Sequence, residues 1–351
     1  MRKVIILATW LVVVFIYIAT NAMAITLTPI STAFNSPIGI DYHEPTNSVV
    51  ISANYYSGGW PYNFERINFD GTHVQFSTAA GFSDEVKIGT VRSGNVGGFT
   101  TGDLFTGNGI DGQIARITNG GATIISPWVD LPGVGNGLMR GSLYVDRTGV
   151  YGGDLIVATT GGEVWRVTST GVPTVIADVN THLEGLITIP NNPVKYGPLA
   201  GKIIAGAEGQ GRLYAFDATG ASTFYTVGVN IEDIDLILAN ENFFGVNFGT
   251  SRILGAPVSE FAAMVGDILL TQEMHSGSGL FQLFWDGVNL QATQLTLDLG
   301  STIPGQWEHV TFAPAGIVEI PPVNGVPEPS TILLLGSGLI GLAGFRRIVK
   351  S

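Results

Sequence analysis

Short apolar runs separated by glycine-rich turns recur along the chain from residue 25 to residue 322. Runs such as DLIVA, KIIAGA and DILL are too short for helices, and polar and apolar residues alternate around them as they do on half-buried strands. The one helical turn that the pattern favours lies in VSEFAAMV, residues 258–265. The pattern therefore predicts an all-β fold.

The strands form a loose repeat. Each copy has an apolar strand, a Gly-Asp or Gly-Lys turn into a second strand, a third strand with aromatic or arginine positions, and a fourth strand after another glycine. The copies cover residues 47–76, 101–125, 152–176, 201–227 and 266–297. Four short strands in a repeat of about 45–50 residues are typical of the blades of a β-propeller.

The ranges above hold the second to fourth strands of each copy. The first strand lies just before its range, and we expect it to be the innermost strand of its blade. These strands begin at Pro37, Glu85, Leu138, Leu183 and Glu232, and WEHVTFAP adds a sixth at Trp307. Six inner strands predict six blades, with ITLTPIST (residues 25–32) completing the sixth blade beside WEHVTFAP. The segment at residues 239–261 is then interpreted as an insertion. Five blades, or a pair of β-sandwiches, are the alternatives.

Composition supports a turn-rich sheet protein, because the chain of 351 residues contains 48 glycines and only 13% charged residues. No cysteine occurs. This excludes a lipoprotein signal, a disulfide framework, a thiol nucleophile and every cysteine-based metal site.

The first 24 residues have the features of a signal peptide. Arg2 and Lys3 precede an apolar run, and Ala22-Met23-Ala24 gives the small-x-small pattern that signal peptidase cleaves. Cleavage after Ala24 would leave Ile25 as the first mature residue and export the domain. An uncleaved membrane anchor is the alternative.

The whole chain has a formal net charge of −12. The part between the N-terminal leader and the C-terminal tail is more acidic still, because the leader and the tail together contain five basic residues and only one acidic residue. Such a surface repels nucleic acid and anionic lipid headgroups. We therefore expect no nucleic-acid partner.

The C-terminal end has three parts. Residues 321–329 predict an extended linker, because Pro327 and Pro329 disfavour helix at the residues before them. The uncharged segment at residues 331–345 would span about 22 Å as a helix, short of the bilayer's ~30 Å core. Basic residues follow this helix and would keep the C-terminal end of the membrane segment at residues 330–351 in the cytoplasm. A plain membrane anchor and an edge strand are the alternatives.

VPEPST, the apolar helix and the Arg-Arg pair together closely resemble the PEP-CTERM sorting signal. The residues that carry the resemblance are Val326, Pro327, Glu328, Pro329, Arg346 and Arg347. The resemblance implies a Gram-negative-type bacterium and processing near Pro-Glu-Pro by an exosortase. It also implies brief residence in the inner membrane, followed by the periplasm, cell surface or extracellular space, commonly in species that make exopolysaccharide.

Several inner strands begin with a carboxylate, at Glu85, Glu184, Asp233 and Glu308. On a propeller these strand starts lie near the central channel, where carboxylate oxygens suit Ca²⁺ or another divalent ion. PIGIDYHEPTNSVVISANY also loosely resembles six-bladed propellers of the NHL and gluconolactonase type, which implies a catalytic divalent ion there. The alternative is that these acids only cap strand starts and bond turn amides.

Two further features concern binding and catalysis. Tyr55, Tyr56, Trp60 and Tyr62 crowd one loop and would suit stacking against sugar rings, although aromatic residues equally cover blade edges. His182 and His309 lie beside strand-start glutamates, where a general base would be useful, but such histidines more often bond the backbone.

No G-x-S-x-G elbow, Walker loop or H-x-x-x-H spacing occurs. The sequence therefore favours a non-catalytic surface or matrix propeller, at residues 25–320, that binds a glycan or another surface protein. A divalent-metal-dependent hydrolase of lactonase or esterase type is the alternative, and a purely structural domain is a third possibility.

Overall fold

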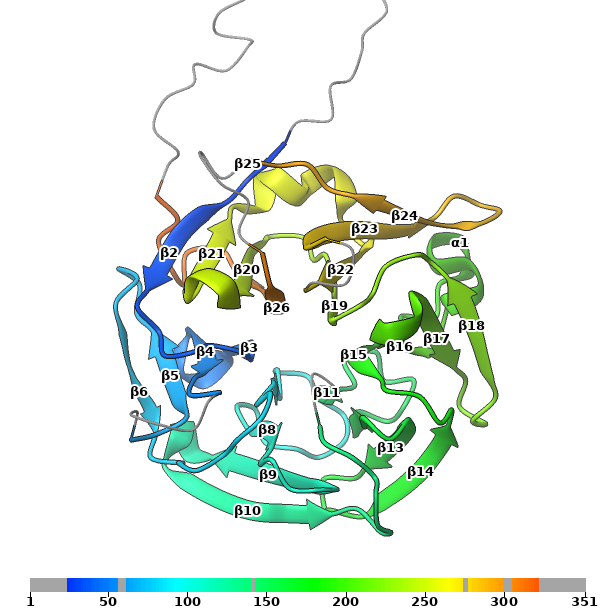
Figure 1. Ribbon diagram of the computed structural model, residues 1–351, viewed down its shortest axis with the longest axis horizontal. Coiled ribbons are helices and arrows are strands. Elements are labelled where there is room, and N and C mark those ends of the chain that lie inside the picture. Colours follow the sequence, from blue (N-terminus) through cyan, green and yellow to red (C-terminus); the bar gives the residue numbers. More distant parts are fainter. Residues whose placement is uncertain (1–23, 56–60, 140–142, 274–276, 299–304, 322–351) are drawn as a thin grey trace, which may run out of the picture.

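A computed structural model describes residues 24–55, 61–139, 143–273, 277–298 and 305–321. Six four-stranded antiparallel sheets stand around a central axis as the blades of a propeller (Figure 1). The six-bladed prediction is confirmed, and the five-bladed and sandwich alternatives are excluded. The predicted signal sequence and the predicted C-terminal sorting segment fall largely on residues 1–23 and 322–351, which lie outside the described residues.

The first four blades each use consecutive strands, from the innermost to the outermost. Blade 1 contains β3 (Ile40–His43), β4 (Ser48–Ser52), β5 (Phe64–Ile67) and β6 (His73–Ser77). Blade 2 contains β7 (Ile88–Thr90), β8 (Leu104–Gly107), β9 (Gln113–Thr118) and β10 (Thr123–Asp130). Blade 3 contains β11 (Leu143–Val145), β12 (Leu155–Ala158), β13 (Glu163–Val167) and β14 (Pro173–Asp178). Blade 4 contains β15 (Glu184–Thr188), β16 (Ile203–Ala207), β17 (Arg212–Phe216) and β18 (Ser222–Thr226).

The last two blades are interleaved along the chain. Blade 5 contains β19 (Asp233–Leu236), β22 (Ile268–Gln272), β23 (Gly279–Trp285) and β24 (Leu290–Gln294). Blade 6 contains, from the inside, β26 (Trp307–Pro314), β20 (Glu241–Asn247), β21 (Arg252–Ala256) and β2 (Thr28–Thr32). After β19 the chain crosses into blade 6 to form the β20–β21 hairpin, and then returns to blade 5.

This arrangement corrects the prediction that residues 239–261 form an insertion. They supply the two middle strands of blade 6, so ITLTPIST and WEHVTFAP share a blade but lie at its opposite edges, with β20 and β21 between them. The N-terminal strand thus closes the ring from outside and the C-terminal strand from inside (Figure 1). A second tie is the parallel pairing of β1 (Ile25–Thr26) with β25 (Leu297–Asp298).

Helical segments are few and short in the described ranges. The α-helix α1 covers Pro193–Tyr196. The 3-10 turns are η1 (Glu44–Thr46), η2 (Asn119–Gly121), η3 (Gly197–Leu199), η4 (Glu208–Gln210), η5 (Phe248–Thr250) and η6 (Val258–Met264). The last of these is the helical turn predicted in VSEFAAMV. Among the residues described, no helix has the length and apolar character needed to cross a membrane.

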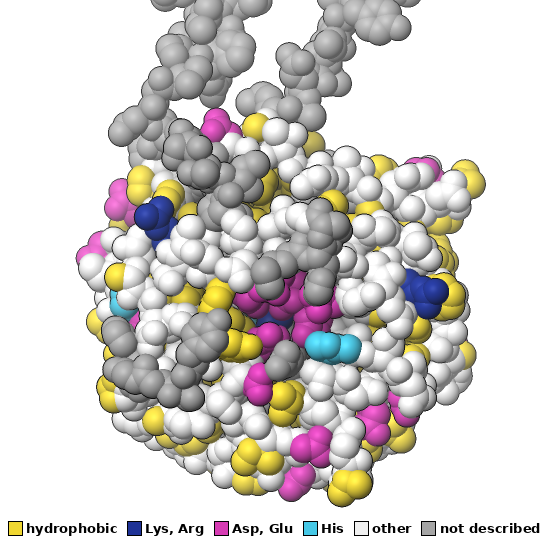
Figure 2. All heavy atoms as spheres, in the orientation of Figure 1, with side chains coloured by type: hydrophobic (Ala, Val, Ile, Leu, Met, Phe, Trp, Pro, Cys, Tyr) yellow, Lys and Arg dark blue, Asp and Glu magenta, His cyan; other side chains and the backbone are white. Residues whose placement is uncertain are grey.

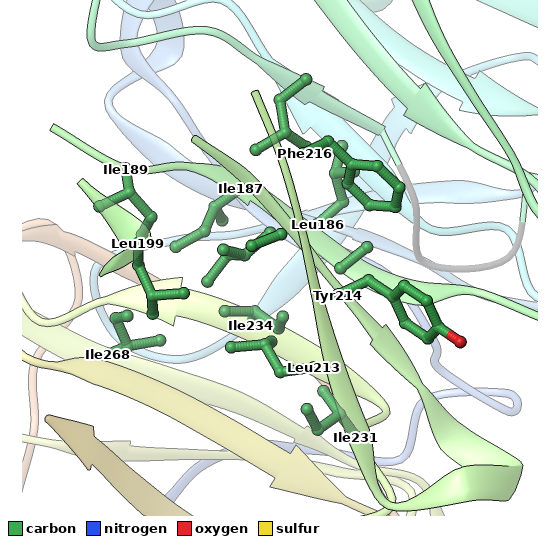
Figure 3. Packing of buried hydrophobic residues seen from close by; sticks show 14 of the residues in the cluster. Leu186, Ile187, Ile189, Leu199, Leu213, Tyr214, Phe216, Ile231, Ile234 and Ile268 are labelled. Carbon is green, nitrogen blue, oxygen red and sulfur yellow. The ribbon is translucent and has the colours of Figure 1, made fainter. Parts of the chain in front are cut away.

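The hydrophobic core lies between blades, because each sheet is apolar on both faces near the axis. In the largest cluster, Leu186 and Leu213 of blade 4 pack with Ile234 and Ile268 of blade 5 (Figure 3). The second strand of a blade is therefore buried throughout, as in β12 and β16, whereas an outermost strand such as β14 is mostly exposed. Burial between neighbours makes the blades mutually dependent.

Glycine lets neighbouring inner strands approach closely around the channel. A Cβ on Gly89 would lie 2.6 Å from the carbonyl oxygen of Leu143, and one on Gly185, whose φ is +61°, would lie 2.7 Å from the Cα of Asp233. Any side chain at these positions would push adjacent blades apart. The inner ring is consequently narrow, and polar side chains gather at its two ends.

Candidate functional site: an acidic mouth of the central channel

The starts of the inner strands meet at one end of the channel and bring carboxylates together there. Figure 2 shows acidic side chains gathered around the centre of this face, with a basic side chain deeper within. We call this end the acidic mouth; its glutamates are Glu85, Glu184, Glu208, Glu232, Glu273 and Glu308.

Ligand atoms in the acidic mouth form three overlapping groups, in each of which all the atoms lie within 4.8 Å of one another. The groups are Glu85–Glu184–Glu232, His182–Glu184–Glu208 and Glu208–Glu232–Glu273. Glu184 and Glu232 are buried, while the other members are half-buried. The groups share members, so they form one continuous set of oxygen ligands with a histidine at its edge.

Lys87 lies among these carboxylates and is fully buried. Its ammonium group forms an ion pair with Glu232 Oε1 and lies 4.0 Å from Glu308 Oε2. Burial alone would lower the pKa of Lys87, but the surrounding glutamates, Glu232 first, outweigh it and hold that pKa well above its ordinary value. Lys87 is therefore a fixed internal cation.

One ammonium cannot compensate several buried carboxylates. Burial, followed by the charge of Glu232, raises the pKa values of Glu184 and Glu308 well above their usual range. Burial opposes the ionisation of Glu232 too, but Lys87 and the neighbouring carboxyl groups lower its pKa. Glu184 Oε2 and Glu308 Oε2 are buried, and neither oxygen accepts a hydrogen bond from the described residues. These two groups thus hold a proton or bind a cation.

Of the four predicted metal ligands, three lie at this mouth: Glu85, Glu184 and Glu308. Asp233 lies deeper, where its Oδ2 accepts a hydrogen bond from the Val310 amide at 2.8 Å. The preceding residue, Glu232, takes the position facing the cluster. The sequence did not point to Glu208, which lies in the turn η4, to Glu273, which directly follows β22, or to Lys87, which directly precedes β7.

The two histidines singled out in the sequence have different surroundings. His182 Nε2 lies 2.8 Å from Glu184 Oε1 at the rim of the acidic mouth. His309 lies inside the channel, where its Nδ1 accepts a hydrogen bond from the Ile40 amide at 3.1 Å. Burial, followed by the charge of Lys87, lowers the pKa of His309 to about 3. His309 is therefore neutral and structural.

The aromatic loop is only partly described, since Tyr56 and Trp60 lie outside the described residues. The Tyr62 hydroxyl donates a hydrogen bond to Glu65 Oε1 at 3.2 Å, and the Tyr55 ring lies edge-on to Phe248 at 5.9 Å. The proposal that these side chains stack against sugar remains untested by this geometry.

The opposite end of the channel holds a separate ion cluster around Asp41 of β3. Arg92 and Arg147 lie 3.1 and 3.5 Å from its two carboxylate oxygens. Burial opposes ionisation, but the two guanidinium groups and bonds from Thr90 lower the pKa of Asp41 to about 2. For Asp235 burial prevails, with the charge of Asp41 adding to it, and raises the pKa to about 6.

The raised pKa of Asp235 predicts a pH-dependent effect of D235N. The pKa of Asp235 is higher in the folded than in the unfolded protein, so ionisation of Asp235 lowers the free energy of unfolding. This destabilisation is absent below about pH 4 and complete above about pH 6. The change in unfolding free energy caused by D235N should therefore be more stabilising at about pH 7.5 than at about pH 4, by ~2–3 kcal/mol. Denaturant titrations at both pH values measure the difference, and an equal effect at both would refute this assignment.

The chain matches a known sorting signal at its C-terminal end, and its body resembles solved structures. Residues 325–347 match the PEP-CTERM protein-sorting motif. No curated protein is significantly similar to the chain in sequence.

The solved structures that resemble the body have low sequence identity to it. One described as a gluconolactonase has 13% identity and a TM-score of 0.50, with 81% of this chain and 84% of that chain covered. A protein of unknown function from Bacteroides thetaiotaomicron has 12% identity and a TM-score of 0.50, with 83% and 73% covered. A gluconolactonase from Xanthomonas campestris has 14% identity and a TM-score of 0.49, with 81% of both chains covered. At these identities the similarity to the first two structures concerns the fold alone.

Proposed function

We propose that this chain is an exported surface or matrix protein whose propeller binds a divalent cation, such as Ca²⁺, at the acidic mouth. In this proposal the protein acts by binding a glycan or a surface protein. The observation that carries the cation site is the three overlapping groups of ligand atoms, within each of which the atoms lie within 4.8 Å of one another. Glu184, a member of two groups, and Glu308, which lies beside them, each have an Oε2 without a donor in the described part of the chain.

The PEP-CTERM motif makes an exosortase the processing partner of this chain. We further propose that signal peptidase cleaves after Ala24 and that the exosortase removes the segment after the Pro327-Glu328-Pro329 motif. The mature protein would then be the propeller at residues 25–320 with a short linker, and the membrane segment at residues 330–351 would be a temporary stop.

Both cleavages predict the mass of the mature protein from its native host. Intact-mass spectrometry of the extracellular fraction should give an N-terminus at Ile25 and a C-terminus near Pro327. A variant with Glu328→Gln tests the sorting motif while leaving the propeller unchanged, and we expect it to accumulate in the membrane fraction. Extracellular protein that retains Arg346 and Arg347 would rule out processing by an exosortase.

The donor set fits Ca²⁺ better than a transition metal. Ca²⁺ takes six to eight oxygen ligands in flexible geometry, and the groups nearest one another here are carboxylates from three different blades. Glu184, Glu208, Glu232 and Glu273 would hold the ion, with Lys87 compensating the charge beneath it. When bound, the ion would offer its remaining coordination positions to hydroxyl or carboxylate oxygens of a ligand.

Cation binding predicts a calcium-dependent melting temperature. The propeller at residues 25–321 should melt at least about 3 °C higher in millimolar Ca²⁺ than in EDTA, since ligand binding to the folded state alone stabilises it. The double variant with Glu184→Gln and Glu232→Gln should lose the shift, whereas Glu163→Gln on β13, far from the channel, should keep it. Equal melting in Ca²⁺ and EDTA would count against the proposal.

A hydrolase is the second candidate, and the position of His182 favours it. This histidine lies beside Glu184 at the edge of the carboxylate cluster, where a general base could act on a bound ester or lactone. Turnover of lactones or aryl esters in the presence of Ca²⁺, Mn²⁺ or Zn²⁺ that His182→Ala abolishes would establish catalysis. Calcium binding without turnover supports the binding function.

A further inference from the structure

A hollow of about 300 Å³ lies at the end of the channel opposite the acidic mouth. Its walls are the loops that follow the inner strands β7, β11 and β19. None of the glutamates of the acidic mouth lines it. We call it the arginine hollow, because Arg92 and Arg147 both face it.

A short repeat in the sequence builds this hollow. Blade 2 has Arg92-Ser93-Gly94 after β7, and blade 3 has Arg147-Thr148-Gly149 after β11. Both glycines have positive φ, +81° at Gly94 and +74° at Gly149, so each loop has a left-handed residue two positions after its arginine. The Asn95 side chain donates a hydrogen bond to the Gly153 carbonyl at 2.7 Å and ties the two loops together.

The two arginines are held rigidly. Arg92 lies 4.8 Å above the ring of Tyr42, and Arg147 lies 4.9 Å above the ring of Tyr144. Both guanidinium groups contact the carboxylate of Asp41, at 3.1 and 3.5 Å. Stacking on one side and an ion pair on the other fix their orientation before any ligand arrives.

Arg147 nevertheless retains unused donors. Within the described part of the chain, its one hydrogen bond is the long contact of 3.5 Å with Asp41, and its buried Nε has no acceptor. A guanidinium group has five N–H donors, so most of those of Arg147 have no acceptor in the described protein. The Nε of Arg92 is likewise buried without an acceptor in the described ranges.

The hollow also has an unused acceptor. Glu241 Oε1 lies 3.6 Å from Arg92, but its Oε2 is buried and receives no hydrogen bond from the described residues. Asp146, by contrast, is satisfied, since it accepts bonds from the amides of Tyr151 and Gly153 and from the Thr188 hydroxyl. Donors and an acceptor thus face one small space, where leaving them unpaired is unfavourable.

We propose that the arginine hollow binds a neutral, hydroxyl-rich ligand, namely a sugar unit, with Arg147 donating to its oxygens and Glu241 accepting from its hydroxyls. A hydroxyl both donates and accepts, which matches this mixed wall. Asp41, Asp235 and Glu241 oppose an anion, and the two arginines oppose a cation. The volume of about 300 Å³ is at the lower end for ligand pockets and suits a small sugar unit. The site is independent of the acidic mouth.

Saturation-transfer NMR on the propeller at residues 25–321 tests the proposal. The probes are glucose, galactose, mannose, rhamnose and the anionic sugar glucuronate, each at millimolar concentration. We expect transfer to at least one neutral sugar. Val96 lines the hollow and is 71% exposed, so Val96→Trp should fill the hollow without disturbing the core, and should weaken binding at least about tenfold. Glu241→Gln should weaken it similarly.

Glu163→Gln on β13, which lines neither the arginine hollow nor the acidic mouth, is the matched control and should leave sugar binding unchanged. The measurements are made in EDTA, so that no ion occupies the acidic mouth. Transfer to glucuronate alone, or to none of the neutral sugars, would overturn the assignment. Neutral-sugar binding in EDTA that persists in Val96→Trp would place the ligand elsewhere and would equally overturn it. Melting temperatures of the variants verify that each remains folded.

Discussion

Replacing Lys87 by methionine should destabilise the propeller by about 3–5 kcal/mol in the presence of EDTA. Methionine fills a similar volume but removes the ammonium group, which leaves the buried carboxylate of Glu232 without its partner. Removing one member of a buried ion pair typically has a cost of this size, because the remaining charge is uncompensated. Denaturant titration measures the loss.

Calcium should partly reverse this loss, since a divalent ion can take over the compensation of charge. An ion at a hundredfold excess over its Kd stabilises the folded state by about 2.7 kcal/mol, and the more negative site of the variant should bind the ion more tightly than the wild type does. The stabilisation by Ca²⁺ should therefore be larger in Lys87→Met than in the wild-type protein.

Lys195→Met is the matched control. Lys195 pairs with Asp267 near α1, but its side chain is 36% exposed, so its removal should cost under about 1 kcal/mol and change no response to Ca²⁺. If Lys87→Met unfolds at the same denaturant concentration as the wild type, the carboxylates of the mouth do not depend on an internal cation.

Removal of residues 25–34 should abolish cooperative unfolding altogether. This segment carries β2, which is the outer edge of blade 6, and it buries Ile25, Leu27, Ile30 and Phe34. At about 1.5–3 kcal/mol for each buried side chain, the loss is on the order of 6–12 kcal/mol, comparable to the total stability of most domains. Thermal melting followed by circular dichroism provides the measurement.

A synthetic peptide of residues 25–35 should restore a cooperative transition when it is added to the truncated chain, whereas a scrambled peptide of the same composition should not. This pair of peptides separates specific strand pairing from general hydrophobic contact. A truncated propeller that melts within a few degrees of the mature protein would show that the ring does not need its N-terminal strand.

The strands could be predicted from the sequence, but the partners of two of them could not. Each of the six inner strands lies at the position predicted from its apolar run and the glycine turn beside it. A short apolar run between glycines is typical of a buried strand. The hairpin of β20 and β21 could not be assigned to blade 6 in this way, because its pattern of apolar and polar residues would be the same if it were an insertion. Only the burial of Phe243 and Phe244 between neighbouring blades decides where it belongs.

The candidate site was partly predictable for a similar reason. Acids at the start of an inner strand must lie near one mouth, which identified Glu85, Glu184 and Glu308. A difference of one residue reverses the direction of a side chain on a strand, and this separates Glu232, at the mouth, from Asp233, inside the channel. Lys87 gives no signal in the sequence, because its charge is balanced only by glutamates distant along the chain.

Isothermal titration of Ca²⁺ into the metal-free propeller at residues 25–321 tests the central claim most directly. Because burial raises the pKa values of Glu184 and Glu308 well above their usual range, we predict saturable binding with release of protons, seen as a heat that differs between buffers of different ionisation enthalpy. The double variant with Glu184→Gln and Glu232→Gln should give no such heat. Absence of saturable binding by the wild-type propeller, or equal binding by the double variant, would contradict the assignment of the acidic mouth as a cation site.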